Sequence, residues 1–404
     1  MRRHVRFTVR EHARSPLLAL IPLLVLILFS LAGPSARAAD PPLPRPVVLA
    51  LQELHLFDGP GIVGADVIGS LAVSADARRA YIGLRYSYRS ERDNLVVVEI
   101  DRHGHARPGV RRYADSSLPL PKDTQSLVND ILLHPFRPKL YLATSLNAAV
   151  PAEATQLLTV YELDARGLPA GRPRSFECGN PHKSLLALAI HPTGNVLYLV
   201  GWGSAAVHTY KLDPSGEPQG QPIVTGVGGY GKYAIALSQD ARHLYLGTYP
   251  DVLEIVDLDP AGMPVGTPRS IKGGSEENYL VFRYTPDGLL LEQKTPKGQR
   301  LGFWPFDVQG SPLSSPQVRS DVQPSAWCAD PRTGRMWVAV DVTSKQAASQ
   351  QTGSVQMAGV VAEDFNAAQP KPLVPLVTRA GQQGARMAVS ANGTPVLLTK
   401  QAGP

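Results

Sequence analysis

A strand, turn and strand unit that recurs along the chain most limits what this sequence can fold into. In the four clearest copies an apolar run leads into a polar turn with Pro, Gly or Asp, and then into a second apolar run that carries a tyrosine. Self-similarity at a fixed period of a few tens of residues is typical of repeat architectures such as propellers and solenoids. The four clearest copies are Leu71–Leu84, Ile131–Thr144, Leu186–Gly201 and Ile235–Thr248.

Each clear copy continues into a third apolar run that ends in an aspartate, namely Asp101, Asp164, Asp213 or Asp259. In three copies the aspartate opens a turn of the form D-x-x-G-x-P-x-G-x-P. Glycine supplies positive φ in such a turn and proline pre-sets the bend, so a fourth short strand is expected to follow. Four short strands per unit are typical of a propeller blade.

Three weaker copies begin at Val281, Ala326 and Met387 and bring the number of units to seven. The spacing between equivalent turn residues is 45 to 60 residues, and its shorter values are close to the period of a four-stranded blade, about 40 to 45 residues. The equivalent turn residues are Ser74, His134, His191, Ser238, Thr285, Asp330 and Ser390. We interpret the longer intervals as surface loops, and His134 and His191 as turn residues because both precede a proline.

The two ends of the repeat complete each other. The seventh copy stops near the C-terminus without outer strands, whereas Val47–Phe57 precedes the first copy without a partner. We expect this N-terminal run to pair with Met387–Thr399, because that pairing closes the ring and removes the edges that an open array would expose. The sequence therefore predicts an all-β fold: one seven-bladed β-propeller over residues 39–404, closed by an N-terminal strand in the last blade.

Residues 1–38 are predicted to be a signal peptide. Five arginines precede the apolar centre Leu17–Gly33, and Ala36-Arg37-Ala38 has the small-x-small pattern of a cleavage site. The uncharged span Ser15–Ala36 is also long enough to cross a bilayer, so an uncleaved membrane anchor stays open as the alternative. The prediction places the mature protein in the periplasm or outside the cell.

The net charge of +6 is largely a property of this segment. Without residues 1–38, 34 Lys and Arg face 33 Asp and Glu, and no basic stripe is visible. A mature charge near +1 does not favour nucleic acid as a partner. We predict no nucleic-acid partner, and membrane contact only through an uncleaved signal segment.

The sequence has no metal-binding or cofactor-binding motif in the structural context that such a motif needs. Cys178 and Cys328 fall in different units, so two unpaired thiols are favoured over a disulfide, although an oxidising compartment leaves pairing open. The chain has no C-x-x-C, H-E-x-x-H or G-x-S-x-G motif. GVGGYG at Gly226–Gly231 matches G-x-G-x-x-G, but it follows a turn and precedes a strand, whereas a dinucleotide fingerprint needs a helix after it. No metal and no cofactor are predicted.

The seven units, with an L-Y-L/I strand and a Y-x-L-D-x-x-G-x-P-x-G tail, resemble the seven-bladed propeller lactonases related to 6-phosphogluconolactonase and the bacterial YVTN-repeat propellers. The resemblance covers residues 47–400 and is carried by turn and packing residues. It implies hydrolysis of a cyclic ester at the axial mouth, where Pro181-His182 precedes an inner strand as in that family. The chain departs from the family in its export signal and in the divergence of its fifth to seventh units.

Two functions follow from this resemblance and this compartment. The first is a lactonase, a carboxylic ester hydrolase that opens a sugar lactone or another organic lactone. The second is a non-catalytic propeller of the cell envelope that binds a protein or carbohydrate partner. A phosphorylated sugar lactone belongs in the cytosol, so the export signal argues against that substrate.

Candidate site residues follow from the register of the repeat. Because inner strands converge on the axis, polar residues just before or within them can meet although they are distant in sequence. Four units have a larger polar residue nine positions before the equivalent turn residue, and the other three units have Ala or Gly there. The four residues are Gln125, His182, Glu276 and Asp321. We predict that Gln125 and Asp321 bind substrate.

Arg283 is the strongest single outlier, because five units have an apolar residue at its place. An arginine there needs a partner or a wet channel. It is a candidate to hold a carboxylate, a phosphate or a developing oxyanion, and the alternative is a structural ion pair with Glu276 or Glu277. Opening a lactone also needs a base, for which His182 and Glu276 or Glu277 are candidates, and the alternative for His182 is an ordinary loop histidine.

Overall fold

A computed structural model describes most of the repeat region. The described residues are 44–54, 68–85, 93–118, 125–147, 155–178, 185–229, 231–238, 240–249, 252–272, 278–285, 288–295, 298–307, 309–314, 317–319, 324–330, 333, 335–344, 352–360, 376–380 and 382–401. The chain divides into two units, Met1–Leu43 and Pro44–Pro404. The predicted signal peptide lies outside the described residues, so its cleavage or anchoring stays a prediction.

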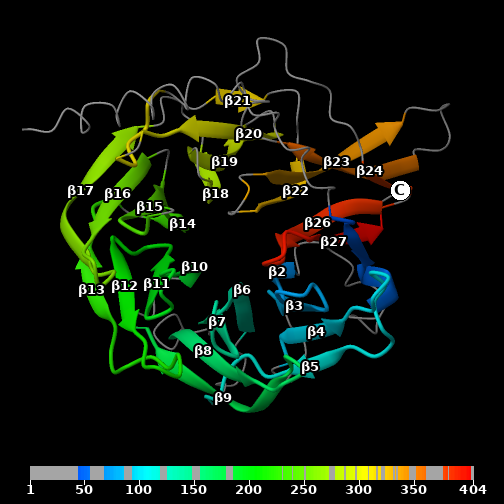
Figure 1. The fold of residues 1–404 in the computed structure, drawn as a ribbon, viewed down its shortest axis with the longest axis horizontal. Helices are drawn as coiled ribbons and strands as arrows, with labels where there is room; N and C mark the ends of the chain where they lie inside the picture. The colour runs from blue at the N-terminus through cyan, green and yellow to red at the C-terminus, as the bar shows by residue number, and fades with distance from the viewer. Residues whose placement is uncertain are drawn as a thin grey trace, which may run out of the picture. The chain divides into compact units, whose positions relative to one another are not determined.

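The unit Pro44–Pro404 is built from seven sheets, or blades, and each of the first six consists of four consecutive antiparallel strands (Figure 1). Blades 1 and 2 consist of β2 (Ile68–Val73), β3 (Arg79–Leu84), β4 (Leu95–Glu99) and β5 (Arg111–Tyr113), then β6 (Gln125–Leu133), β7 (Lys139–Asn147), β8 (Thr155–Leu163) and β9 (Pro169–Glu177). Blades 3 and 4 consist of β10 (Leu185–Ile190), β11 (Val196–Gly201), β12 (Ala206–Lys211) and β13 (Ile223–Gly226), then β14 (Lys232–Leu237), β15 (His243–Thr248), β16 (Val252–Leu258) and β17 (Pro264–Lys272).

Blades 5 and 6 have the same order, although their sequences have diverged, and blade 7 consists of three described strands. Blades 5 and 6 consist of β18 (Asn278–Thr285), β19 (Gly288–Thr295), β20 (Gly298–Pro305) and β21 (Gln317–Arg319), then β22 (Pro324–Ala329), β23 (Met336–Ser344), β24 (Thr352–Val360) and β25 (Val377–Ala380). Blade 7 combines β26 (Gln382–Val389) and β27 (Pro395–Gln401) with β1 (Val47–Ala50).

The first strands of the seven blades form a closed ring. β2, β6, β10, β14, β18, β22 and β26 each contact the next in this order, and β26 contacts β2 (Figure 1). This arrangement confirms the predicted all-β seven-bladed propeller.

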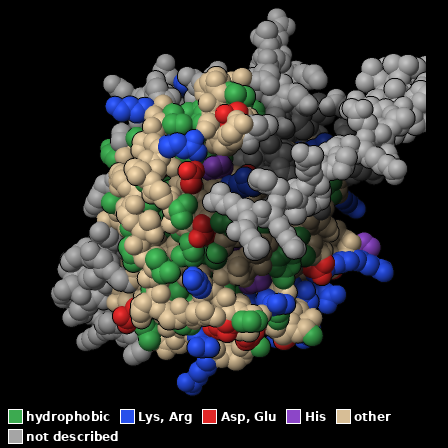
Figure 2. Space-filling view, turned by 60° about the vertical axis from the view of Figure 1, so that its left-hand side comes forward, with side chains coloured by type: hydrophobic (Ala, Val, Ile, Leu, Met, Phe, Trp, Pro, Cys, Tyr) green, Lys and Arg blue, Asp and Glu red, His purple; other side chains and the backbone are tan. Residues whose placement is uncertain are grey.

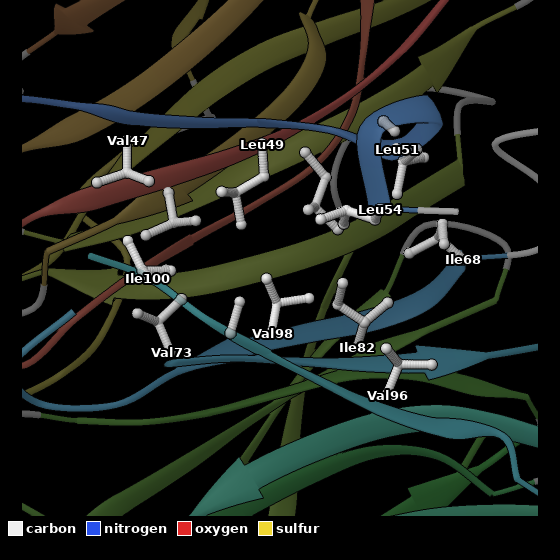
Figure 3. Packing of buried hydrophobic residues seen from close by; sticks show 14 of the residues in the cluster. Val47, Leu49, Leu51, Leu54, Ile68, Val73, Ile82, Val96, Val98 and Ile100 are labelled. Atoms are coloured by element: carbon white, nitrogen blue, oxygen red, sulfur yellow. The ribbon is translucent and has the colours of Figure 1, made fainter. Parts of the chain in front are cut away.

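The N-terminal strand closes the ring as predicted. β1 pairs in parallel with β27, from Val47 opposite Val396 to Ala50 opposite Thr399. The strand is shorter than expected, because Leu51–Leu54 form the 3-10 helix η2, whose apolar side chains turn back onto the same core. Residues 55–57, the end of the predicted run, lie outside the described residues. Figure 3 shows Val47, Leu49 and Leu54 packed over apolar side chains of blade 1.

The hydrophobic core is divided among the seven interfaces between blades. Seven clusters of buried apolar residues each combine side chains of two neighbouring blades. Both faces of a blade are thus covered, which explains why the second strands are apolar without alternation. β11 is buried at every position, whereas the outer strand β13 is largely exposed.

The conserved spacing of tyrosine and glycine within the repeat has a structural cause. A tyrosine on the second strand donates its hydroxyl proton to a glycine carbonyl in the turn before the outer strand of the next blade, and we call this hydrogen bond the tyrosine latch. It joins blades 1 to 5 in succession. The four latches are Tyr81 to Gly167 (2.7 Å), Tyr141 to Gly216 (2.6 Å), Tyr198 to Gly262 (2.5 Å) and Tyr245 to Gly310 (3.1 Å).

The aspartate that opens this turn fixes its shape. Asp164 accepts hydrogen bonds from the backbone N–H groups of Arg166 and Leu168, both at 2.8 Å, through the same oxygen. Gly167 has a φ of 69°, which brings its carbonyl toward the preceding blade. The same pair of bonds is made by Asp101, Asp213, Asp259 and Asp307. The predicted turn is confirmed, and it extends to the fifth unit.

Two further predictions, on the cysteines and on the turn histidines, are confirmed. Cys178 and Cys328 are both buried, and they do not form a disulfide with each other. The ring of His134 accepts the backbone N–H groups of Phe136 and Arg137, both at 3.0 Å, and that of His191 contacts the Thr193 hydroxyl at 2.7 Å. Both histidines therefore shape their turns.

Two surface observations bear on partners. On the face drawn in Figure 2, Lys and Arg side chains are interspersed with Asp and Glu rather than gathered in one basic area. Within the described part of the chain, no helix has the length and apolar character needed to span a membrane. The absence of a nucleic-acid partner stays a prediction.

Candidate functional site

The register of the repeat predicts the site at one end of the ring, where the inner strands begin. His182, Glu276, Glu277 and Asp321 lie outside the described residues. Whether these side chains meet stays a prediction.

Two other predicted positions are described in their backbone only. Gln125 opens β6 and pairs with Asn147, and Arg283 lies in β18 opposite Leu290. Their side chains are outside the described part of the structure. The described equivalent of His182 in blade 4 is Gly229, three residues before Lys232, where β14 begins. The loops predicted to carry the site therefore precede inner strands, as the repeat register required.

Every inner strand carries a β-bulge near this end. The register with the second strand shifts at the same place in all seven blades, five residues before the equivalent turn residue. A bulge bends its strand and re-aims a side chain, and bulges are frequent beside active sites. The bulged residues are Gly69, Asn129, Leu186, Tyr233, Leu280, Ser325 and Ala385. Because they differ in type, sequence comparison gave no sign of the bulge.

Three aromatic rings gather at this end between blades 3 and 4. Trp202 follows β11, Tyr233 is the bulged residue of β14, and Tyr249 follows β15. The ring centroid of Trp202 lies 4.9 Å from that of Tyr233 and 5.8 Å from that of Tyr249. The ring centroids of the two tyrosines are 6.3 Å apart. Trp202 is 37% exposed and Tyr249 48% exposed. We call these three residues the aromatic trio, an apolar surface that solvent can reach.

The trio is supported by a tight glycine loop. Gly231 has a φ of 81°, and a Cβ atom there would lie 2.9 Å from the ring of Trp202 and 3.4 Å from Tyr249. Only glycine fits between these rings without displacing them. The GVGGYG motif thus provides close packing between β13 and β14, and no helix follows it, as the sequence interpretation required.

A buried ion pair lies beneath this loop. Lys232, the first residue of β14, is fully buried, and its Nζ is 3.0 Å from Oε2 of Glu254 on β16. The same ammonium donates a hydrogen bond of 2.7 Å to the carbonyl of Gly229. Burial lowers the pKa of Lys232 more than the neighbouring Glu254 carboxylate raises it. The pair is sealed from solvent, and through the bond to the Gly229 carbonyl it holds the glycine loop in place.

Blade 2 supplies a second set of buried polar groups near this end. Asp115 accepts hydrogen bonds from the side chains of Asn94, at 2.9 Å, and Ser126. Asn94 also donates to the carbonyl of Ser126, at 3.2 Å, and so joins blade 1 to the start of β6. A fully buried carboxylate with these donors is held in one orientation.

The bulge of blade 2 is also tied into hydrogen bonds. Asn129 donates to the hydroxyl of Ser145 at 2.8 Å, and Ser145 donates to Gln156 at 2.6 Å. The next residue, Asp130, accepts the backbone N–H of Leu188 in blade 3 at 2.8 Å. This bond connects β6 and β10, the inner strands of blades 2 and 3, and fixes their spacing.

Sequence reasoning missed Lys232, Glu254 and the aromatic trio. A signal for Lys232 was present, because the equivalent residues of the other units, such as Ile68 and Val128, carry no charge. The same register comparison that singled out Arg283 would have found it. Glu254 and the trio had no such signal, since they meet only through the packing of blade 3 on blade 4. Among described residues, no group of three or more His, Cys, Asp or Glu side chains is arranged to hold a metal ion.

Solved structures share this architecture. A candidate 6-phosphogluconolactonase from Bacteroides fragilis superposes with a TM-score of 0.50 and 14% identity, over 77% of this chain and 86% of that one. The chain has a lactonase-like propeller fold. A second candidate 6-phosphogluconolactonase, from Bacteroides uniformis, gives a TM-score of 0.51 with 11% identity over 77% and 88% of the two chains. A protein from Lactobacillus plantarum gives 0.51 with 13% identity over 79% and 86%.

The similarity to these solved structures establishes the fold of the chain. Its reaction has to be argued from the site. No protein-family model and no curated protein sequence matches the chain. The resemblance to YVTN-repeat propellers stays a prediction.

Proposed function

We propose that this lactonase-like propeller is exported and opens a sugar lactone or another organic lactone at the axial mouth. The observation that carries the proposal is the aromatic trio at the end of the ring where the inner strands begin. Trp and Tyr combine a broad apolar face with a polar edge, which suits a ring-shaped ligand with one apolar face and several hydroxyl groups. The nearest buried charges, Lys232 and Glu254, neutralise each other, which favours an uncharged ligand.

The reaction needs a base and a stabiliser of negative charge. In the proposed mechanism His182 or Glu276 takes a proton from water, and the resulting hydroxide adds to the lactone carbonyl carbon. Arg283 stabilises the tetrahedral oxyanion. The ring C–O bond then breaks, its electron pair goes to the departing oxygen, and that oxygen takes a proton to give a hydroxy acid. Glu277 is the alternative base, and Gln125 and Asp321 orient the substrate.

The proposed compartment follows from residues 1–38. An arginine-rich start, an apolar centre and Ala36-Arg37-Ala38 favour export to the periplasm or the medium. Fractionation of cells that express the full chain tests this point. We expect the protein in the exported fraction with a mass lowered by the loss of about 38 residues. A full-length protein in the membrane fraction would instead support the anchor.

The activity is tested with purified protein and a panel of neutral sugar lactones and aliphatic lactones, by following acid release at constant pH. We expect turnover that falls at least about 100-fold in His182→Ala and in Arg283→Ala, the usual scale for a general base or an oxyanion donor. Arg242→Ala, an exposed arginine in a turn of blade 4, is the matched control. Lack of turnover over the whole panel would contradict the hydrolase.

The second candidate is a non-catalytic envelope propeller that binds a carbohydrate. The exposed trio favours it equally, because a sugar can stack on these rings without any reaction. Binding of oligosaccharides that is weakened in Trp202→Ala, together with no lactone turnover, would select this function. Reproducible capture of an envelope protein instead would select the protein-binding form of the alternative.

A further inference from the structure

The seam where the chain closes its ring contains a cavity of about 280 Å³. The cavity lies between the N-terminal segment Arg45–Val47, two turns of blade 1 and Thr394 of blade 7. The two turns follow β2 and β4, so they belong to the end of blade 1 opposite the bulge at Gly69. This cavity is therefore separate from the mouth proposed to hold the lactone.

Three arginines line the cavity, and each comes from a different part of the fold. Arg78 belongs to the turn after β2, Arg102 to the turn after β4, and Arg45 to the segment that leads into β1. His103 stands beside Arg102 and accepts a hydrogen bond of 3.0 Å from its Nε. A guanidinium group offers five N–H donors in a planar fork that matches carboxylate and phosphate oxygens.

The two carboxylates in the lining have their own turn partners. Asp76 accepts hydrogen bonds from the Ser74 hydroxyl at 2.6 Å and from the Arg78 backbone at 3.0 Å. Asp101 accepts the backbone N–H groups of His103 and His105 at 2.8 and 2.9 Å. Each aspartate uses its Oδ1 oxygen for the turn, and of the three guanidinium groups only that of Arg102, through Nε, donates to another side chain of the described residues.

Blade 4 offers an internal comparison, because it repeats the same turn. Ser238, Asp240 and Arg242 make the same contacts as Ser74, Asp76 and Arg78, and Ala241 has a φ of 58° against 57° for Ala77. The neighbouring turn of blade 4 carries Pro260-Ala261 where blade 1 has Arg102-His103.

Ring closure adds the third basic group at blade 1. The N-terminal segment reaches the turn after β4, where a Cβ on Gly104 would lie 3.3 Å from the side chain of Val47. Arg45 comes two residues before Val47 and lines the same cavity. The combination of three arginines therefore depends on the seam and is not a general feature of the repeated turn.

We propose that this seam cavity binds a small anion that carries carboxylate or phosphate groups. Its lining holds three arginines against two aspartates, and the aspartates are engaged in their turns. Arginine binds such groups in bidentate geometry, and these charge-assisted bonds are about twice as strong as neutral ones. The volume admits a small ligand rather than a polymer, since sites for drug-sized molecules begin at roughly 300 Å³. The site goes beyond the proposed lactone reaction, because it lies at the other end of blade 1.

Calorimetric titration of the purified protein at constant ionic strength tests the proposal. The probes are inorganic phosphate and succinate in separate arms, with chloride as the reference anion. We expect saturable binding of at least one probe with a Kd below about 1 mM. Arg78→Ala and Arg102→Ala should weaken it at least about tenfold each, which corresponds to loss of a charged hydrogen bond. Binding of phosphate alone would identify a phosphate site, and of succinate alone a carboxylate site.

Arg242→Ala is the matched control, because it removes an exposed arginine from the same turn in blade 4. It should leave binding unchanged. Equal weakening by Arg242→Ala and Arg78→Ala would overturn the proposal in favour of general charge attraction, and so would the absence of heat for both probes. Since Arg78 and Arg102 are exposed, their variants should keep the melting temperature of the parent protein. Lactone turnover is not expected to change in them, so failure of this site and failure of the proposed hydrolase are distinguishable.

Discussion

The first four interfaces between blades and the last three are held together in different ways. Each of the first four has a tyrosine latch in addition to its apolar cluster. At each of the last three interfaces another residue stands where the first four have the latch tyrosine. These residues are Leu290, Trp337 and Val396, and each pairs with the first-strand residue two positions before the turn, as the tyrosines do. These side chains are buried in the clusters between blades 5 and 6, 6 and 7, and 7 and 1.

The two kinds of interface differ in how strictly they orient neighbouring blades. A latch joins one hydroxyl to one carbonyl and therefore fixes how far one blade is rotated against the next. An apolar side chain provides area but little direction. The fifth blade also shows the two changes together, since Leu290 replaces the tyrosine directly opposite Arg283, the charged outlier. The loss of a latch and the gain of a candidate site residue thus fall on one cross-strand pair.

The largest effect is expected from Glu254→Ala, which leaves the Lys232 ammonium buried without its carboxylate. Removing one partner of a buried pair costs about 3–5 kcal/mol. The free energy of unfolding, measured with urea, should fall by that amount. It would show that the interface between blades 3 and 4 depends on this pair as well as on its latch.

The control for this prediction is the double variant Lys232→Met with Glu254→Leu. An apolar pair of similar size removes both charges, and such replacements are often neutral or stabilising. An equal loss of stability in the single and double variants would contradict the argument and assign the effect to packing alone.

Alkaline pH should weaken the first three interfaces between blades. Burial raises the pKa of Tyr81 from 10 to about 12, and it also raises the pKa of Tyr141 and Tyr198. Between these values the unfolded chain has lost its phenol protons while the folded protein retains them, so the unfolding free energy falls as pH rises. A shift of two pKa units corresponds to about 2.7 kcal/mol for Tyr81.

Urea unfolding between pH 8 and pH 12 measures this slope. Tyr81→Phe removes a titrating group with a raised pKa and should make the slope shallower. Equal slopes in the parent protein and in Tyr81→Phe would show that other groups cause the alkaline loss.

At neutral pH a single latch should be worth less. Tyr198→Phe keeps the ring but leaves the carbonyl of Gly262 without its donor, which costs about 1–3 kcal/mol for a buried acceptor. The midpoint of urea unfolding should fall without a change of slope. Tyr249→Phe is the matched control and should stay within about 0.5 kcal/mol of the parent.

The smallest effect is expected where a latch is missing. The indole N–H of Trp337 is buried and has no hydrogen-bond partner among the residues that the structure describes. Trp337→Phe loses contact area but also removes this unsatisfied donor, so we expect a change of about 1 kcal/mol or less. A loss larger than that of Tyr198→Phe would show that blades 6 and 7 have a polar contact equivalent to the latch.

Much of the fold was predictable because the repeat is local. Apolar runs, turn glycines and Asp164 with its equivalents act within a few residues, and their spacing gave the number of blades and the closure by β1. The extent of β1 was overestimated, since Leu51–Leu54 are apolar enough for a strand but coil into η2 against the same core. Of the predicted site, only the strands that carry Gln125 and Arg283 are described, and the roles of the side chains stay predictions.

By itself the sequence determined the architecture, since the unit of strand, turn and strand depends on short-range backbone geometry and occurs seven times. Tertiary structure alone decided which side chains share the mouth of the ring. The trio of Trp202, Tyr233 and Tyr249, the Lys232–Glu254 pair and the cavity at the seam each combine residues from separate strands or blades. The distances between these residues depend on how the blades pack and where the strands bulge. That packing minimises exposed apolar area, and it leaves no periodic pattern in the sequence.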